Sequence, residues 1–301
     1  MSRFLEGKTV AVTGGGNGIG RAVSIACASA GAHVVVADYG VAMDGSDPSS
    51  EVAQRVVDEI QSAEGSALAV AGDVSQFATG ADIVSAAMDT WGRLDGVVCV
   101  AGNLRERMIF NMSEEEFDAV VAVHLKGHFN LYRHASAVMR KQEGGGSLVG
   151  FASAAFVGST AQANYSAAKG GIISLTRSAA LALHRYGVRA NCIAPVARTR
   201  MSENVPFEIE TGEPSAVAAM AVYLVSDAAR NITAQTYTVV GPRISVWNQP
   251  SEIRSMFAPN GVEWSPEEIA AWLPGTIGFE EHPMLADMER RMAEMSEAKS
   301  K

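Results

Sequence analysis

The chain has 301 residues, of which 48% are hydrophobic and 19% are charged, and its formal net charge at pH 7 is −9. This length suits one large α/β domain or two small ones. The acidic balance disfavours nucleic acid or an anionic membrane as a partner, and no stretch is long and apolar enough to span a bilayer.

The three cysteines, Cys27, Cys99 and Cys192, lie in apolar segments and lack metal-ligand spacing. They are typical of reduced core residues in a cytoplasmic protein, so we expect no bound metal. Met1 leads within a few residues into the apolar run K-T-V-A-V-T, which argues against a signal peptide. We therefore expect a cytoplasmic location.

Short apolar runs alternate with stretches of helical periodicity. The expected strands are Lys8–Thr13, His33–Asp38, Ala67–Ala71, Gly96–Val100, Gly146–Ser153, Val188–Ala194 and Thr236–Val240. The expected helices are Gly18–Ala30, Glu51–Ala63, a stretch ending at Trp91, one capped by Ser113 that runs to about Lys141, Ala163 to about Tyr186, and Pro214–Ser226. This alternation predicts a Rossmann-type, doubly wound, seven-stranded parallel sheet with right-handed crossovers. We place it in one domain, residues 1–243, followed by a C-terminal extension, residues 244–301.

A glycine-rich stretch, T-G-G-G-N-G-I-G, follows the first strand and opens the first helix. Glycines there allow a tight turn and let a pyrophosphate approach the N–H groups of a helix N-terminus. A loop without a ligand is the alternative, but the strand before and the helix after are the context that a dinucleotide motif requires. The stretch therefore predicts a dinucleotide site.

Asp38 ends the second strand, eighteen residues after Gly20. This is close to the spacing of about 20 residues expected for a carboxylate that binds the adenosine ribose. Such a carboxylate repels the 2′-phosphate of NADP, and Tyr39 and Gly40 supply no compensating cation. Arg21, inside the first helix, is expected to contact pyrophosphate or an acid. These residues predict NAD rather than NADP; the alternative is that Asp38 only caps its loop.

Tyr165 and Lys169 lie four residues apart, with Ser153 upstream. On a helix the first two share one face. A free tyrosine titrates near pH ~10, and a neighbouring cation lowers that pKa. Such a phenol can exchange a proton with an alcohol or carbonyl, while Ser153 bonds the same oxygen. The alternative is an ordinary surface helix.

Together these motifs resemble the short-chain dehydrogenase/reductase family over residues 4–241. The matching elements are T-G-x-x-x-G-x-G at Thr13–Gly20, G-D-V at Gly72–Val74, A-G at Ala101–Gly102, Ser153, Y-x-x-x-K at Tyr165–Lys169, and N-x-I-A-P at Asn191–Pro195.

The resemblance implies that Tyr165 is the acid/base, that Lys169 lowers its pKa and holds the nicotinamide ribose, and that Ser153 orients the substrate oxygen. It also implies that Asp73 contacts the adenine and Thr199 the carboxamide. The whole implied set of cofactor-binding residues is Thr13, Gly14, Gly16, Asn17, Gly18, Ile19, Gly20, Asp38, Asp73, Val74, Ala101, Gly102, Tyr165, Lys169, Pro195 and Thr199.

The sequence departs from the family pattern at four points. Ser153 precedes Tyr165 by twelve residues where thirteen is commoner, and Pro195–Val196 stands in place of the usual P-G. Cys99 and Val100 replace two asparagines of N-N-A-G, which weakens a brace on the fourth strand. His124 occupies the position of an asparagine that anchors a water in the proton relay. A histidine can also hold a water, so His124 is a candidate for an altered relay; a core histidine bonded to backbone is the alternative.

Within the family, A-V-H-L-K-G-H-F, Q-A-N-Y-S-A-A-K and the C-terminal extension resemble the branch of actinobacterial hydroxysteroid and (3R)-hydroxyacyl-CoA dehydrogenases, which is related to peroxisomal multifunctional enzyme type 2. The resemblance implies an NAD-dependent secondary-alcohol dehydrogenase, with a hydroxyacyl-CoA or steroid as substrate. A non-catalytic, redox-sensing dinucleotide-binding protein is the alternative. The resemblance also implies a homodimer or homotetramer.

Four arginines, Arg105, Arg107, Arg198 and Arg200, follow the fourth and sixth strands. They can hold an anionic tail such as the phosphates of coenzyme A, or pair with surface acids such as Glu106. In the extension, we expect Ile244–Trp247 to prolong the last strand and Ser265–Leu273 to form a short capped helix. The extension either roofs a site, including a neighbour's, or packs in a dimer.

Overall fold

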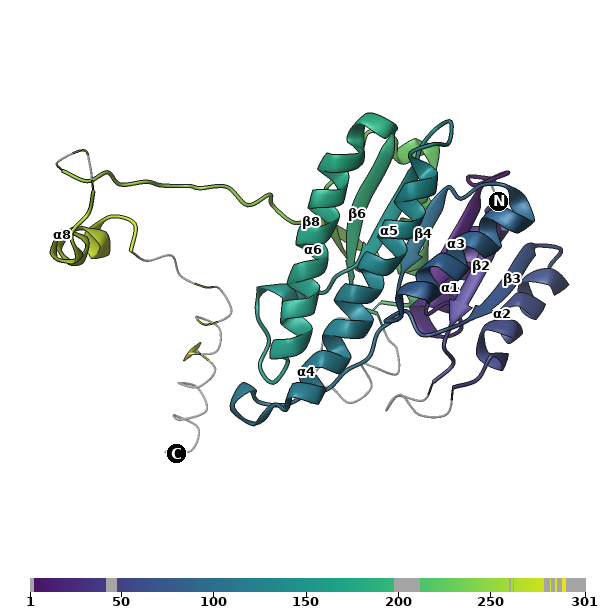
Figure 1. The fold of residues 1–301 in the computed structure, drawn as a ribbon, viewed down its shortest axis with the longest axis horizontal. Coiled ribbons are helices and arrows are strands. Elements are labelled where there is room, and N and C mark those ends of the chain that lie inside the picture. The colour runs from purple at the N-terminus through teal and green to yellow at the C-terminus, as the bar shows by residue number, and fades with distance from the viewer. Residues whose placement is uncertain are drawn as a thin grey trace. The chain divides into compact units, whose positions relative to one another are not determined.

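A computed structural model describes residues 3–41, 48–197, 212–259, 261, 263–278, 282, 285 and 289–290. The chain divides into two compact units, Met1–Trp247 and Asn248–Lys301. The first unit contains the sheet (Figure 1). Over the described ranges, no helix combines the length and apolar character needed to cross a membrane.

The sheet has eight strands in the order β3-β2-β1-β4-β5-β6-β7-β8. The strands are β1 (Thr9–Thr13), β2 (His33–Asp38), β3 (Ser66–Ala71), β4 (Gly96–Cys99), β5 (Gly146–Phe151), β6 (Val188–Pro195), β7 (Thr236–Val240) and β8 (Arg243–Val246). The first seven are parallel, which confirms the predicted Rossmann-type sheet. β8 does not prolong β7, as Ile244–Trp247 was expected to do; it turns back at Gly241 and pairs with β7 antiparallel.

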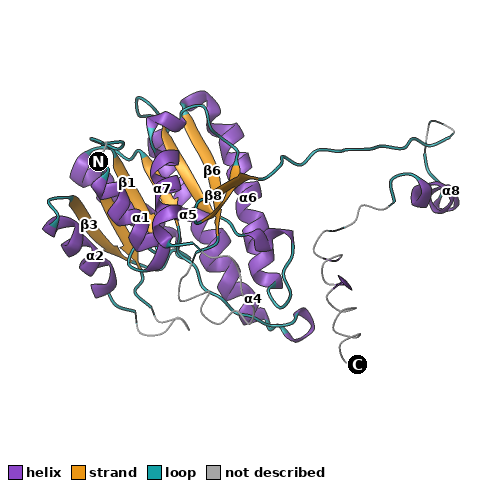
Figure 2. Cartoon of the chain, turned by 180° about the vertical axis from the view of Figure 1, so that it is seen from behind, coloured by secondary structure: helices purple, strands orange, loops and turns teal. Residues whose placement is uncertain are grey.

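Helices cover both faces of the sheet. They are α1 (Gly18–Ser29), α2 (Glu51–Ser62), α3 (Phe77–Trp91), α4 (Glu114–Val121), α5 (Gly127–Met139), α6 (Ala163–Leu183) and α7 (Pro214–Val225). Helices α3, α5 and α6 lie on the face turned toward the viewer in Figure 1, and α1, α2 and α7 on the face seen in Figure 2. The second unit contains the short helix α8 (Pro266–Trp272), which begins at a capping box on Ser265, as predicted.

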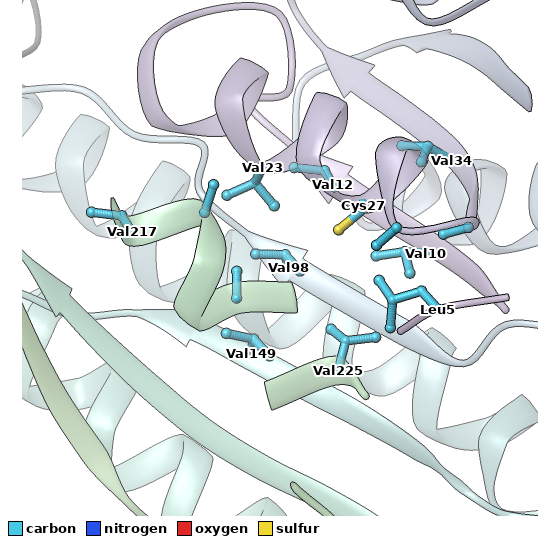
Figure 3. Close-up of a cluster of buried hydrophobic side chains, with 14 of the residues drawn as sticks. Leu5, Val10, Val12, Val23, Cys27, Val34, Val98, Val149, Val217 and Val225 are labelled. Atoms are coloured by element: carbon cyan, nitrogen blue, oxygen red, sulfur yellow. The ribbon is translucent and has the colours of Figure 1, made fainter. Parts of the chain in front are cut away.

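Alternating strand residues divide the core into two layers. On β1, Val10 and Val12 pack with Val23 of α1 and Val217 of α7, in the cluster drawn in Figure 3. Ala11, between them, belongs to the cluster on the opposite face. Side chains alternate in this way because successive residues of a strand point to opposite faces, and in a parallel sheet covered on both sides each face must be apolar.

The predicted continuous helix from Ser113 to Lys141 is interrupted in the structure. Ser113 caps the start of α4 as expected, and it does so in a capping box with Glu116. A π-helical turn, Ala122–Lys126, then separates α4 from α5, which ends at Met139. π-turns insert one residue and frequently mark functional sites. Here the turn contains His124, the residue that departs from the family pattern.

Candidate active site

The site residues gather at the carboxyl ends of the central strands. In the sheet order, β1 lies between β2 and β4, so the chain runs outward in opposite directions on the two sides of β1. In open α/β sheets, ligands bind at such a switch point, in the crevice beyond the strand ends. The glycine-rich stretch follows β1, Ala101 and Gly102 follow β4, and Ser153 follows β5.

The glycine loop is packed so closely that side chains would collide at two positions. A Cβ on Gly14, whose φ is +65°, would lie 2.8 Å from the Ala101 backbone. A Cβ on Gly20 would lie 1.9 Å from the carbonyl oxygen of Gly14. These approaches bring the first turn of α1 against the end of β1. Glycine is therefore required here for packing.

The N-terminus of α1 is open to an anion. Its N-cap residue, Asn17, makes no side-chain capping hydrogen bond with the described residues, and Gly18, Ile19 and Gly20 bring no acid to the first turn. The first N–H groups of a helix have no partner within the helix and carry its positive dipole end. Residues of this loop therefore fit the pyrophosphate of a dinucleotide.

Asp38 is oriented by the loop that it faces. Its two carboxylate oxygens accept hydrogen bonds from the backbone N–H groups of Gly16 (2.8 Å) and Gly40 (2.7 Å). The loop-capping alternative thus describes part of what Asp38 does. A carboxylate has about four lone-pair sites, so two remain for a ligand. Nη2 of Arg21 donates to both carboxylate oxygens of Glu59, which confirms that Arg21 contacts an acid.

The other expected cofactor-binding residues lie at the same edge of the sheet. The hydroxyl of Thr13 accepts from Ala101 N–H at 3.4 Å. Asp73 accepts from the N–H and the hydroxyl of Ser75, so it stabilises its own turn. Its neighbour Val74 is anchored by Asn130, which donates to the Val74 carbonyl at 2.8 Å. Pro195 ends β6, and Thr199 lies outside the described residues.

Ser153, Tyr165 and Lys169 come together as their spacing predicts. Tyr165 and Lys169 share one face of α6, with Lys169 Nζ 5.2 Å from the centroid of the Tyr165 ring. The Ser153 hydroxyl lies close enough to the phenol to lower its pKa. Lys169 Nζ donates to the Phe151 carbonyl at 2.6 Å. The three groups needed for proton exchange with an alcohol are therefore within reach of one another.

Burial changes the acidities that the sequence predicts. It raises the pKa of the Tyr165 phenol to about 12, and the nearby Ser153 hydroxyl only partly opposes it. Burial also lowers the pKa of the Lys169 amine to about 7. In the ligand-free protein, the pKa of Tyr165 is therefore raised overall and not lowered, as the sequence had led us to expect. Loss of water outweighs the neighbouring amine, because burial disfavours the charged form of both groups.

His124 is buried at the edge of the Tyr165 ring, with ring centroids 5.2 Å apart and planes at 88°. Its Nε2 lies 2.8 Å from the carbonyl oxygen of Asn103 and 3.1 Å from the Asn103 nitrogen. Its Nδ1 has no hydrogen-bond partner among the described residues. Burial and the charge of Lys169 hold the pKa of His124 well below its usual range. His124 is thus a neutral imidazole with one nitrogen unpaired beside the phenol.

His128, which lies one helical turn after His124, was not among the predicted site residues. Its ring is fully buried and bonds to backbone groups of two separate elements. The only signal in the sequence is a second histidine four residues after His124, on the same helical face.

The arginines expected near the substrate have other partners where the structure describes them. Arg107 pairs with Glu116 at 2.9 Å, and Arg105 donates to the Leu104 carbonyl. Glu106, considered as an arginine partner, instead accepts from Gln162 at 2.5 Å. The other two of the four, at positions 198 and 200, lie outside the described residues.

Comparison with known proteins identifies the family. Residues 8–208 match the family model for short chain dehydrogenase. The chain belongs to the short-chain dehydrogenase/reductase family. It is 43% identical over 285 residues to hydroxyacyl-CoA dehydrogenase ChsB1 of Mycobacterium tuberculosis, covering 89% of this chain and 88% of that protein.

Two further relatives extend the comparison. The chain is 39% identical over 221 residues to peroxisomal multifunctional enzyme type 2 of Mus musculus, covering 73% of this chain and 30% of that protein. A solved structure of a short chain dehydrogenase from Mycobacterium avium superposes with a TM-score of 0.82 at 43% identity, covering 92% of this chain and 97% of that one. The expected resemblance to this branch is confirmed, and the chain is an oxidoreductase of a dinucleotide-binding family.

Proposed function

We propose that the protein is an NAD-dependent dehydrogenase that interconverts a 3-hydroxyacyl-CoA and its 3-ketoacyl-CoA. The observation that carries the substrate is the 43% identity to a hydroxyacyl-CoA dehydrogenase along nearly the full length of both chains. The assembled Ser153, Tyr165 and Lys169 support the chemistry. A hydroxysteroid is the second substrate class that the same chemistry accommodates.

NAD, when bound, supplies the hydride acceptor. The open N-terminus of α1 and the closely packed glycine loop would hold its pyrophosphate. Asp38, already oriented by Gly16 and Gly40, would accept hydrogen bonds from the adenosine ribose. The 2′-phosphate of NADP would bring like charge against this carboxylate, which favours NAD.

Proton transfer is the task of Tyr165. During alcohol oxidation, its phenolate form takes the hydroxyl proton as the carbinol carbon loses its hydride, and during ketone reduction the phenol returns that proton. Ser153 hydrogen-bonds the same substrate oxygen while its charge changes. Lys169, held against the Phe151 carbonyl, lies where its cationic form would favour the phenolate.

A spectrophotometric assay tests the proposed function. Purified protein is mixed with NAD and a panel of 3-hydroxyacyl-CoAs and hydroxysteroids, and reduced nicotinamide is followed by absorbance. We expect saturable turnover with at least one CoA thioester. Turnover with steroids alone would assign the second substrate class, and NAD binding without turnover on either class would contradict an enzymatic role.

We further propose that the protein is a homodimer or homotetramer built on α4, α5 and α6. The outer faces of these helices expose large apolar side chains, Phe117, Phe129 and Leu181, of which Leu181 is 80% exposed. Exposed apolar patches commonly mark an interface, and these side chains lie on helices that contact one another. Phe129→Glu and Leu181→Glu should reduce the mass measured by light scattering, and an unchanged mass would exclude this face.

The C-terminal extension is proposed to pack against a neighbouring subunit or to roof a site. Within it, Ile253 and Phe257 are 70% and 84% exposed, which suits a segment that docks elsewhere. Truncation after Trp247 tests the proposal and leaves β8 intact. Changed assembly or a changed substrate KM is expected; if both are unaltered, the extension has neither role.

A further inference from the structure

His128 lies beneath the Ser153, Tyr165 and Lys169 site and bonds to backbone on two sides. Its side chain is 2% exposed. Its Nδ1 lies 2.6 Å from the His124 carbonyl oxygen, and its Nε2 lies 3.1 Å from the Phe151 nitrogen. A carbonyl can only accept and an amide N–H can only donate. The two bonds together therefore fix one neutral tautomer, with the proton on Nδ1.

His128 and Lys169 both form hydrogen bonds with the backbone of Phe151. The ladder between β4 and β5 ends at the pair Cys99 and Gly150, one residue before Phe151. Next to the end of this ladder, the Phe151 N–H donates to His128 and the Phe151 carbonyl accepts from Lys169 Nζ at 2.6 Å. The backbone of this one residue is therefore bonded to both side chains, and a shift of Phe151 displaces the lysine amine.

Electrostatics favour a neutral group at this position. Burial, and then the charge of Lys169, lower the pKa of His128 to about 3, although hydrogen bonds to the backbone of His124 and Cys99 oppose the shift. The ring therefore stays neutral at physiological pH. It accepts a hydrogen bond from the Phe151 N–H without placing a second cation next to the lysine.

We propose that His128 is a positioning residue for this dehydrogenase: by holding the Phe151 N–H and the His124 carbonyl at once, it fixes the Phe151 carbonyl that places the Lys169 amine beside Tyr165. The effect on turnover rests on the proposed function, whereas the effect on Lys169 does not. An imidazole is suited to the task because its two nitrogens donate and accept at opposite positions of one rigid ring.

Two amide variants test separately the hydrogen bonds of His128 to His124 and to Phe151. His128→Gln places its amide oxygen near Nε2 and keeps an acceptor for Phe151. His128→Asn places its amide nitrogen near Nδ1 and keeps the donor to His124, but it removes the acceptor that His128 offers to the Phe151 N–H. Both variants are neutral, and each loses one of the two bonds, so they are matched controls for burial and stability.

The first readout needs no substrate. Titration of the Lys169 side chain by ¹³C NMR in the ligand-free protein should give a wild-type pKa for His128→Gln and a shifted one for His128→Asn. The second readout is kcat/KM with a 3-hydroxyacyl-CoA and NAD. We expect a loss of about tenfold or more for His128→Asn and only a few-fold for His128→Gln, because displacement of a catalytic group by about 1 Å costs up to ~100-fold.

Three results would overturn the proposal. The first is a Lys169 pKa that is unchanged in both variants. The second is an equal loss of kcat/KM in the two variants, accompanied by an equal loss of melting temperature. The third requires no variant: ¹⁵N NMR of the wild-type protein should show His128 protonated at Nδ1, and a proton on Nε2 would contradict the bonds described. If the wild type turns over no CoA thioester, the proposed substrate fails while both NMR readouts still decide the role of His128.

Discussion

The two halves of the site, which share one edge of the sheet, use different means to handle charge. The half beyond β1 and β2 consists of the glycine loop, the N–H groups at the start of α1, and Asp38. The carboxylate oxygens of Asp38 already accept hydrogen bonds from backbone amides. The half around α6 consists of ionisable side chains whose charged forms burial disfavours, Tyr165 and Lys169 among them. The first half is ready to bind an anion, whereas the second must gain charge when ligands arrive.

This difference predicts that substitutions can abolish proton transfer without weakening cofactor binding. Removal of the Tyr165 hydroxyl should have the largest effect, because general acid/base groups contribute about 10²–10⁴-fold. Tyr165→Phe should lower kcat/KM by about 10³-fold and leave the affinity for NADH, measured by fluorescence titration, within a few-fold of wild type. A wild-type rate in this variant would remove Tyr165 from the mechanism.

Lys169 shows the cost of burying a charge. Its pKa is about 7 in the folded protein and 10.5 for an unperturbed lysine. Between these values the unfolded chain binds more protons, so the unfolding free energy rises with pH. Lys169→Met removes this dependence. The difference in stability between wild type and variant should increase with pH by up to about 1.4 kcal/mol per unit.

Urea denaturation of both ligand-free proteins at pH 7, 8 and 9 measures this difference. The window stops below pH 10, because Tyr165, whose pKa is raised above its usual value of 10.0, then acts in the opposite direction in both proteins. Parallel stability curves would show that Lys169 keeps its proton in the folded state and that burial does not control its charge.

His124 should have a smaller effect than Tyr165. We expect His124→Ala to lower kcat/KM by about tenfold, because its unpaired Nδ1 is the available position for a water beside the phenol. His124→Gln restores a polar group near Nε2, which contacts Asn103, but none at Nδ1. Equal losses in the two variants would assign the effect to Nδ1. Full activity in His124→Ala would show that His124 has no part in proton transfer and serves only as a core residue.

The smallest expected effect is on cofactor choice. Wild type should prefer NAD, and Asp38→Ala and Asp38→Asn should narrow the ratio of kcat/KM for NAD over NADP by about tenfold, because they remove like charge from the 2′-phosphate. Asparagine keeps one acceptor for the amides of Gly16 and Gly40, so its KM for NAD should rise less. A wild-type preference for NADP would overturn the cofactor assignment.

Features set by residue spacing could be predicted from the sequence. The strands, the Ser113 helix cap and the meeting of Tyr165 with Lys169 follow from periodicity and offset, which local geometry converts directly into position. The raised pKa of Tyr165 in the ligand-free protein could not be predicted, because burial depends on the whole fold. His128 was missed for the same reason, since its partner Phe151 lies on a distant strand.

Isotope transfer tests the central claim most directly. A 3-hydroxyacyl-CoA deuterated at the carbinol carbon is incubated with NAD and the protein, and the reduced cofactor is analysed by mass spectrometry. The account predicts one deuterium in the reduced nicotinamide with wild type and almost none over the same time with Tyr165→Phe. Reduced cofactor without deuterium, or equal labelling by the two proteins, would contradict it.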